Sequence, residues 1–214
     1  MKTHTFTKGE EIANAIIHGI GALLSIAALV ILIVFSSIYG TAAHIVTFTI
    51  YGVTMVLLYA SSTLVHSFPK GKVKDLFEIF DHSSIYLFIA GTYTPILLIV
   101  IKGGLGWALF GIVWGIALVG VLFKSFFTKR FVILSTVFYI LMGWLIILVW
   151  KPLSAVVDPN GLLFLIIGGV LYTIGAIFYV WRGFLYHHAI WHLFVLGGTI
   201  FHFFAILLYI LPIN

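Results

Sequence analysis

The sequence contains no cysteine and few charged residues, and each shortage excludes a class of protein. Without cysteine, the 214-residue chain can form neither a disulfide framework nor a thiolate metal site. Any metal must therefore be bound by histidine, carboxylate and water. Charged residues make up only 8% of the chain and hydrophobic residues 63%, whereas soluble domains carry about 25% charged residues. This composition excludes an ordinary soluble domain.

The net charge of +5 does not indicate a nucleic-acid partner. Lysines and arginines lie between apolar blocks instead of forming one basic patch. Membrane topology explains such a distribution more simply than nucleic-acid binding does. We therefore expect an integral membrane protein with no nucleic-acid partner.

Long charge-free runs predict an all-α membrane protein with seven transmembrane helices. The run 12–69 contains no Lys, Arg, Asp or Glu. As one helix it would be about 87 Å long, far more than a bilayer core of roughly 30 Å. It must therefore fold back, and the turn-forming residues 36–40 are the expected place. With the later runs, the predicted helices are 13–35, 43–66, 80–101, 105–124, 131–150, 160–181 and 187–210.

The positions of lysine and arginine predict the orientation of this bundle. If the N-terminus is inside, nine basic residues lie on the inner side and only Lys102 and Lys151 on the outer side. Because inner loops carry the excess of positive charge, we expect a cytoplasmic N-terminus and an outer C-terminus. The first apolar run exceeds a signal-peptide core, and no internal repeat is visible. Residues 1–214 are thus expected to form one seven-helix domain in the plasma membrane.

Polar residues from four predicted helices converge on one layer near the inner surface. His188 and His192 are four residues apart, so they share a helix face. His66 ends the second predicted helix and Asp81 begins the third. All lie within roughly 15 Å of the inner boundary. Polar stripes of this kind should face the bundle interior, and the remaining ones pair Ser62 with His66 and combine Glu11, Asn14 and His18.

This set of residues predicts a zinc site. Three neutral imidazoles with an open fourth position are a common catalytic zinc arrangement, which assigns His66, His188 and His192 as ligands. Asp81 could hold a water molecule and move its proton. Ser62 could donate a hydrogen bond to a metal-bound oxygen or to a substrate oxyanion, and the sequence does not choose between these roles.

The other polar residues have simpler interpretations. Glu11 and Asn14 support the site or, equally, cap the first helix. His44 and His202 lie away from the inner layer, and packing roles are expected for them. His82 and His187 adjoin site candidates but point about 100° away on a helix, so neither is predicted as a ligand.

Five motifs along the chain resemble the hemolysin III family, within the progestin and adipoQ receptor superfamily. They are Glu11-x-x-Asn14-x-x-x-His18, Ser62-x-x-x-His66, Phe80-Asp81-His82, Ala90-Gly-Thr-Tyr-Thr-Pro95 and His188-Ala-Ile-Trp-His192. The resemblance implies a seven-helix bundle with a cytoplasmic N-terminus. It also implies zinc on His66, His188 and His192, with Asp81 and Ser62 beside it. A bacterial member in the inner membrane is expected, since the long N-terminal domain of the hormone-receptor members is lacking.

Three functions are compatible with these residues. The first is zinc-dependent hydrolysis of a membrane lipid amide or ester, similar to alkaline ceramidases, or a role in membrane lipid homeostasis. The second is a non-enzymatic receptor or regulator in which zinc ties helices together. The third is an oligomeric pore-forming cytolysin, as the family name suggests. The sequence leaves the substrate and the oligomeric state open.

Overall fold

The computed structural model describes residues 6–211, and helices are the only regular secondary structure in that range. The helices are α1 (Lys8–Tyr39), α2 (Ala42–Ser67), α3 (Lys72–Pro95), the π-helical η1 (Ile96–Ile101), α4 (Gly103–Phe127), α5 (Val132–Gly143), the 3₁₀-helical η2 (Trp144–Val149), α6 (Trp150–Ser154), α7 (Pro159–Val180) and α8 (His187–Tyr209).

Seven continuous stretches are long and apolar enough to cross a membrane, which confirms the predicted number. The third stretch combines α3 with η1, and the fifth combines α5, η2 and α6. Two predicted starts were wrong, since α1 begins at residue 8 instead of 13 and α3 at residue 72 instead of 80. Both helices open with charged turns, which a search for charge-free runs leaves out. Thr7 and Glu10 form a capping box at the true start of α1.

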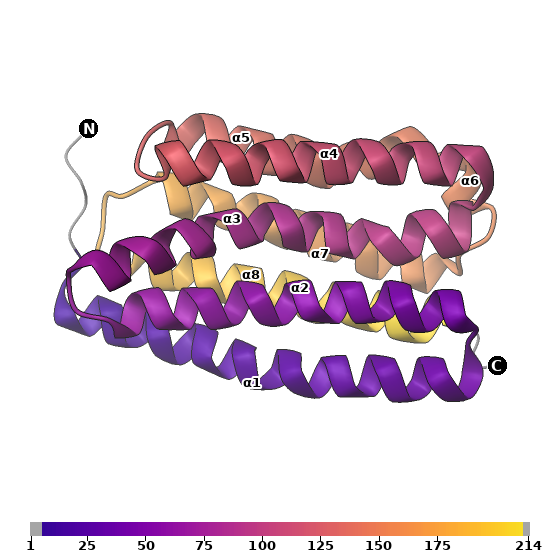
Figure 1. Cartoon of the computed structure of the whole chain (residues 1–214), viewed down its shortest axis with the longest axis horizontal. Coiled ribbons are helices and arrows are strands. Elements are labelled where there is room, and N and C mark those ends of the chain that lie inside the picture. The colour runs from indigo at the N-terminus through magenta and orange to yellow at the C-terminus, as the bar shows by residue number, and fades with distance from the viewer. Residues whose placement is uncertain (1–5, 212–214) are drawn as a thin grey trace.

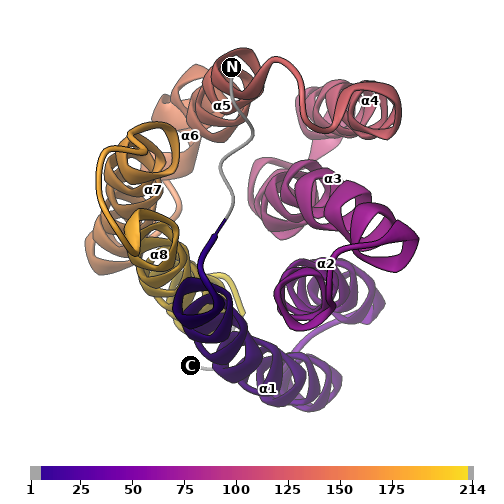
Figure 2. The same ribbon diagram turned by 90° about the vertical axis from the view of Figure 1, so that its left-hand side faces the viewer.

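The helices form an elongated bundle in which neighbours along the chain run antiparallel (Figure 1). Viewed from the end where α1 begins, α1, α2, α3, α5, α7 and α8 surround a central space, and α4 packs outside α3 (Figure 2). Because the number of spans is odd, α1 begins at one end of the bundle and α8 finishes at the other. The start of α1, the end of α2 and the starts of α3 and α8 therefore lie at one end.

The basic residues separate between the two ends of the bundle as the charge pattern predicted. Lys8 and Arg182 mark the end where α1 begins, and Lys102 and Lys151 lie at the opposite end. Lys2 falls outside the described residues. Which end faces the cytoplasm stays a prediction from the excess of positive charge.

Large apolar side chains cover the outside of the bundle, as expected where lipid replaces water. Leu23 and Phe126 are 72% and 79% exposed. The interior is packed closely around aromatic side chains such as Tyr51 and Tyr59. Gly91 lets α3 approach α2, because a Cβ at this position would collide with the Thr54 hydroxyl. The outward-facing apolar side chains are thus available to contact lipid, and the inward-facing side chains pack between helices.

Irregular backbone interrupts two of the spans. In the third span, the α-helix changes to a π-helical turn directly after Pro95. In the fifth span, the Tyr93 hydroxyl donates to Gly143 O and accepts from Ile146 N, each at 2.7 Å. Tyr93 therefore satisfies backbone groups that the change from α5 to η2 leaves free.

Candidate metal centre

The three histidines predicted as metal ligands meet at the end of the bundle where α1 begins. His66 lies near the end of α2, and His188 and His192 lie on the first two turns of α8. One ring nitrogen from each lies within 4.8 Å of those of the other two. His66 is 8% exposed and His192 is 1% exposed. Two helices far apart in sequence thus deliver a histidine cluster that could hold a metal ion.

The start of α1 holds the start of α8 in place. The backbone N–H of Tyr186, the residue before α8, donates to Glu10 Oε1 at 3.0 Å. Tyr186 has a left-handed conformation with φ 63°, so the chain turns sharply into the helix. His188 follows two residues later. The capping carboxylate of α1 is therefore also an anchor for the helix that carries two of the three histidines.

Glu11 has a different role from its neighbour. Its Oε2 lies 2.6 Å from His66 Nδ1, and its Oε1 accepts a hydrogen bond from Lys74 Nζ at 2.7 Å. The capping interpretation of Glu11 and Asn14 was therefore wrong, because Thr7 and Glu10 cap α1. One helix position separates the two functions, since adjacent residues point about 100° apart.

The remaining polar residues of α1 also face the cluster. The ring of His18 stacks on that of His192, with centroids 3.5 Å apart and an interplanar angle of 15°. Asn14 Nδ2 lies 3.5 Å from His66 Nδ1. Both residues are buried. The structure thus brings the predicted stripe of Glu11, Asn14 and His18 against the histidines.

Asp81 and Ser62 occupy different positions relative to the cluster. Asp81 lies on the wall of a cavity that His18, His188 and His192 also line. Ser62 is fully buried one turn before His66 on α2, and its hydroxyl has no hydrogen-bond partner. Ser62 does not belong to the cavity wall. Asp81 is thus placed to meet a ligand in the cavity, and Ser62 is enclosed within the bundle on the helix that carries His66.

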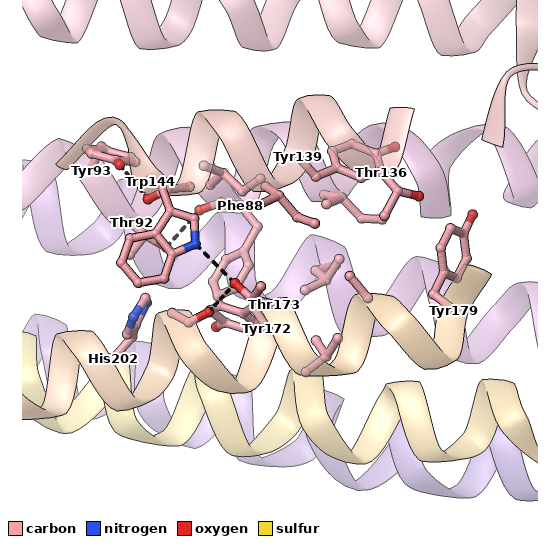
Figure 3. A pocket seen from close by; sticks show the side chains of 18 of the residues that line it. Phe88, Thr92, Tyr93, Thr136, Tyr139, Trp144, Tyr172, Thr173, Tyr179 and His202 are labelled. Carbon is pink, nitrogen blue, oxygen red and sulfur yellow. Dashed lines mark hydrogen bonds between the residues drawn. The ribbon is translucent and has the colours of Figure 1, made fainter. Parts of the chain in front are cut away.

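The cavity has a volume of about 170 Å³ and extends from the histidine cluster along the bundle. Its wall comes mainly from α3, α5, η2, α7 and α8 (Figure 3). Most lining side chains are apolar or aromatic, including Phe88, Tyr139 and Trp144. Trp144 Nε1 donates to Thr173 Oγ1 at 3.0 Å across the wall. The histidine cluster therefore adjoins a long apolar space.

Two histidines that the sequence did not predict as ligands line this wall. His82 Nε2 lies 3.1 Å from the Tyr179 hydroxyl, and His82 Nδ1 donates to Glu78 O at 2.8 Å. His202 donates from Nε2 to Leu165 O at 3.1 Å at the far end of the cavity. Neither belongs to the three-histidine cluster. No local signal identifies them, because the wall forms only when α7 and α8, which pack together, face α3 across the bundle (Figure 2).

The donor atoms suit a metal of the kind that imidazole binds. His66 Nε2 and His192 Nδ1 are buried and have no hydrogen-bond partner. Buried polar atoms are nearly always paired, so these nitrogens indicate a ligand. Imidazole nitrogens in a set without sulfur favour zinc, copper, iron or nickel over magnesium or calcium. The residues present therefore fit a bound transition-metal ion.

Comparison with known proteins assigns the family. Residues 6–203 match the family described as "Haemolysin-III related". The chain belongs to this family. The match spans α1 to most of α8 and includes every residue of the histidine cluster.

Curated relatives extend from bacteria to mammals. The chain is 57% identical to Hemolysin-3 of Bacillus cereus over 95% of its length and 93% of that protein. It is 58% identical to the Hemolysin-3 homolog of Bacillus subtilis, covering 95% of this chain and 96% of the relative. The human monocyte to macrophage differentiation factor is 30% identical over 77% of this chain and 71% of that protein. No solved structure matches the chain. The chain is thus a hemolysin III-type membrane protein.

Proposed function

We propose that this protein is a zinc-dependent membrane hydrolase that cleaves an amide or ester bond of a membrane lipid and so contributes to membrane lipid homeostasis. His66, His188 and His192 would bind the zinc ion. When bound, zinc lowers the pKa of a coordinated water molecule and polarises a carbonyl group. The protein would act in the plasma membrane, with the histidine cluster near the cytoplasmic surface.

Asp81 is the proposed general base and acid. Its position on the cavity wall, together with His188 and His192, would let its carboxylate accept a proton from water and return it to the leaving group. Ser62 would donate a hydrogen bond from its otherwise unpartnered hydroxyl to an oxygen held among the histidines.

The cavity supports a lipid as the substrate. Apolar and aromatic side chains such as Phe88, Ile89 and Ile147 would hold an acyl chain and would exclude water from the reacting bond. The observation that carries the proposal is that a buried histidine cluster and a carboxylate lie at one end of an apolar cavity inside a membrane bundle.

Turnover by purified protein tests this function. The full chain, loaded with zinc in lipid nanodiscs, would be incubated with ceramides and with phospholipids, and released fatty acid would be measured. We expect release by the wild type and loss of release after chelation, restored by added zinc. A zinc-loaded protein that cleaves none of these lipids contradicts the proposed activity.

A regulator with structural zinc is the second candidate, and one observation favours it. The ligands come from α2 and α8, so a metal ion would tie together helices far apart in sequence. In that case Asp81→Asn would leave function unchanged, whereas the hydrolase requires the carboxylate.

A pore is the third candidate, suggested by relatives named Hemolysin-3. Polar groups on the cavity wall bond to the protein itself, as Thr92 does to Phe88 O and Thr173 to Gly169 O. Among residues 6–211, the cavity wall of a single bundle therefore offers no continuous polar lining, and conduction would require oligomers. Conductance of zinc-loaded protein in liposomes would support this candidate.

A further inference from the structure

We propose that Glu11, paired with Lys74, is a positioning residue that fixes the orientation of the His66 ring and leaves Nε2 free to bind a metal ion. The inference rests on the zinc site of the proposed function and assigns a role to two residues outside the ligand set. It makes the start of α1 part of the metal centre, although α1 contributes no ligand to the three-histidine cluster.

The contact of Glu11 determines the tautomer of His66. Glu11 Oε2 lies 2.6 Å from His66 Nδ1, within the range of a charge-assisted hydrogen bond. A carboxylate can only accept, so Nδ1 must carry the proton. In a neutral imidazole the lone pair is then on Nε2. That atom is buried, has no hydrogen-bond partner and belongs to the residue that completes the cluster.

Lys74 holds the carboxylate from its other side. Lys74 Nζ lies 2.7 Å from Glu11 Oε1, the oxygen that His66 does not contact. Because each carboxylate oxygen has its own partner, the Glu11 side chain is fixed with Oε2 toward His66. The lysine also supplies the opposite charge that a largely buried carboxylate requires.

This support belongs to His66 alone among the three ligands. Within residues 6–211, neither His188 nor His192 forms a hydrogen bond or ion pair with a carboxylate. His192 Nδ1 is buried without a hydrogen-bond partner. The chain Lys74–Glu11–His66 also links the starts of α3 and α1 to the end of α2. Loss of Glu11 should therefore weaken the α2 ligand selectively.

Zinc affinity of the purified full chain tests this role. Glu11→Gln keeps the side-chain length and removes the charge, and Glu11→Asp keeps the charge and shortens the reach. Removing an outer partner of a metal-binding histidine typically costs about 10–100-fold in affinity. We expect losses of this size in both variants, measured by competition with a chromogenic chelator. Asp75→Asn is the matched control, since Asp75 is an exposed carboxylate on α3 that pairs with Lys129, a residue outside the site.

Two readouts separate positioning from a structural role. The first is the rise in Tm on adding zinc, which should shrink in the Glu11 variants, whereas a structural defect lowers the metal-free Tm and leaves the rise unchanged. The second is the visible spectrum of bound Co²⁺, which should change with the altered ligand field. Asp75→Asn should match the wild type in both.

The outcomes distinguish this inference from the proposed function. Equal zinc affinity and equal Co²⁺ spectra in wild type, Glu11→Gln and Glu11→Asp overturn the positioning role alone. A wild type that binds no zinc overturns the metal site and this inference together. Weakened zinc binding in the variants, with no lipid turnover by the wild type, supports Glu11 as a positioning residue and contradicts the hydrolase.

Discussion

The two ends of the central cavity differ in how many of their buried polar groups form hydrogen bonds within the protein. At the far end, the hydroxyl of Tyr172 bonds to Thr199, and Trp144 bonds to Thr173. At the histidine end, several buried atoms have no hydrogen-bond partner, namely both ring nitrogens of His18, His66 Nε2, His192 Nδ1 and the hydroxyl of Ser62. Away from the histidine cluster, His202 Nδ1 and the Tyr51 hydroxyl also lack a partner among the described residues.

This difference distinguishes polar groups that stabilise the fold by bonding within the protein from polar groups that are available to bind a ligand. In a membrane interior, each unpaired polar group costs free energy, and a protein normally pairs such groups within itself. The far end largely follows this rule, and its hydrogen bonds stabilise the wall. The histidine end has more unpartnered buried groups, as expected of a site that binds a ligand. Substitutions at the histidine end should therefore change zinc binding or turnover, whereas substitutions at the far end should change the free energy of unfolding.

The largest effect is expected from His192→Ala. This change removes one of three ligands, so zinc should fall from about one ion per chain to none, as measured by elemental analysis of the purified protein. His66→Ala should behave in the same way. His202→Ala is the control, because His202 lies on the cavity wall but outside the cluster.

Equal zinc in the wild type, His66→Ala and His192→Ala would refute the ligand assignment. Loss of zinc in His202→Ala as well would indicate a general defect in folding, and a thermal unfolding curve of each variant resolves that case.

Asp81→Asn should have the next largest effect, on catalysis alone. The amide keeps the size of the side chain but cannot accept a proton, and general acid–base catalysis typically contributes about 10²–10⁴-fold. We expect turnover to fall by that factor while zinc content and Tm stay at wild-type values. Unchanged turnover would favour the structural-metal regulator.

Much of the fold could be predicted from composition, because membrane spans follow directly from charge-free length. The spans were correct in number, and the late predicted start of α1 has a specific cause. The turn that contains Glu10 and Glu11 is helical because Thr7 caps it. The prediction counted only charge-free residues, so it left this charged first turn out of the helix. The breaks in the third and fifth spans also depend on tertiary contacts, as the bonds of Tyr93 to α5 and η2 demonstrate.

For the candidate site, sequence spacing predicted which residues lie close together, but it did not predict the separate role of each residue. The pair His188 and His192 is visible from i, i+4 spacing, and charge topology placed His66 in the same layer. The separate roles of Glu10 and Glu11 depend on a rotation of about 100° and on partners more than 50 positions away. The cavity wall could not be predicted, since it depends on how α7 and α3 face each other across the bundle.

Thr173→Val should lower stability without affecting zinc. Valine keeps the shape of threonine but leaves Trp144 Nε1–H without its acceptor at the far end of the cavity. Such a loss costs about 1 kcal/mol of the free energy of unfolding. Equilibrium unfolding in mixed micelles measures it, and zinc content should stay at the wild-type value. A loss of zinc here would contradict the separation of the two ends.

Ser62→Ala should have the smallest effect on stability. The sign of the change in the free energy of unfolding separates the histidine end, where no loss is expected, from the far end, where Thr173→Val lowers it. The hydroxyl is fully buried and unpartnered, so removing it breaks no hydrogen bond and relieves an unsatisfied group. We expect the metal-free protein to keep its free energy of unfolding or gain a few tenths of a kcal/mol, on the order of what a lost desolvation cost returns. Lipid turnover by the zinc-loaded variant should fall several-fold, because the hydroxyl then has a partner to lose. A destabilised metal-free Ser62→Ala would mean that the hydroxyl is bonded within the protein, and the histidine end would then resemble the far end.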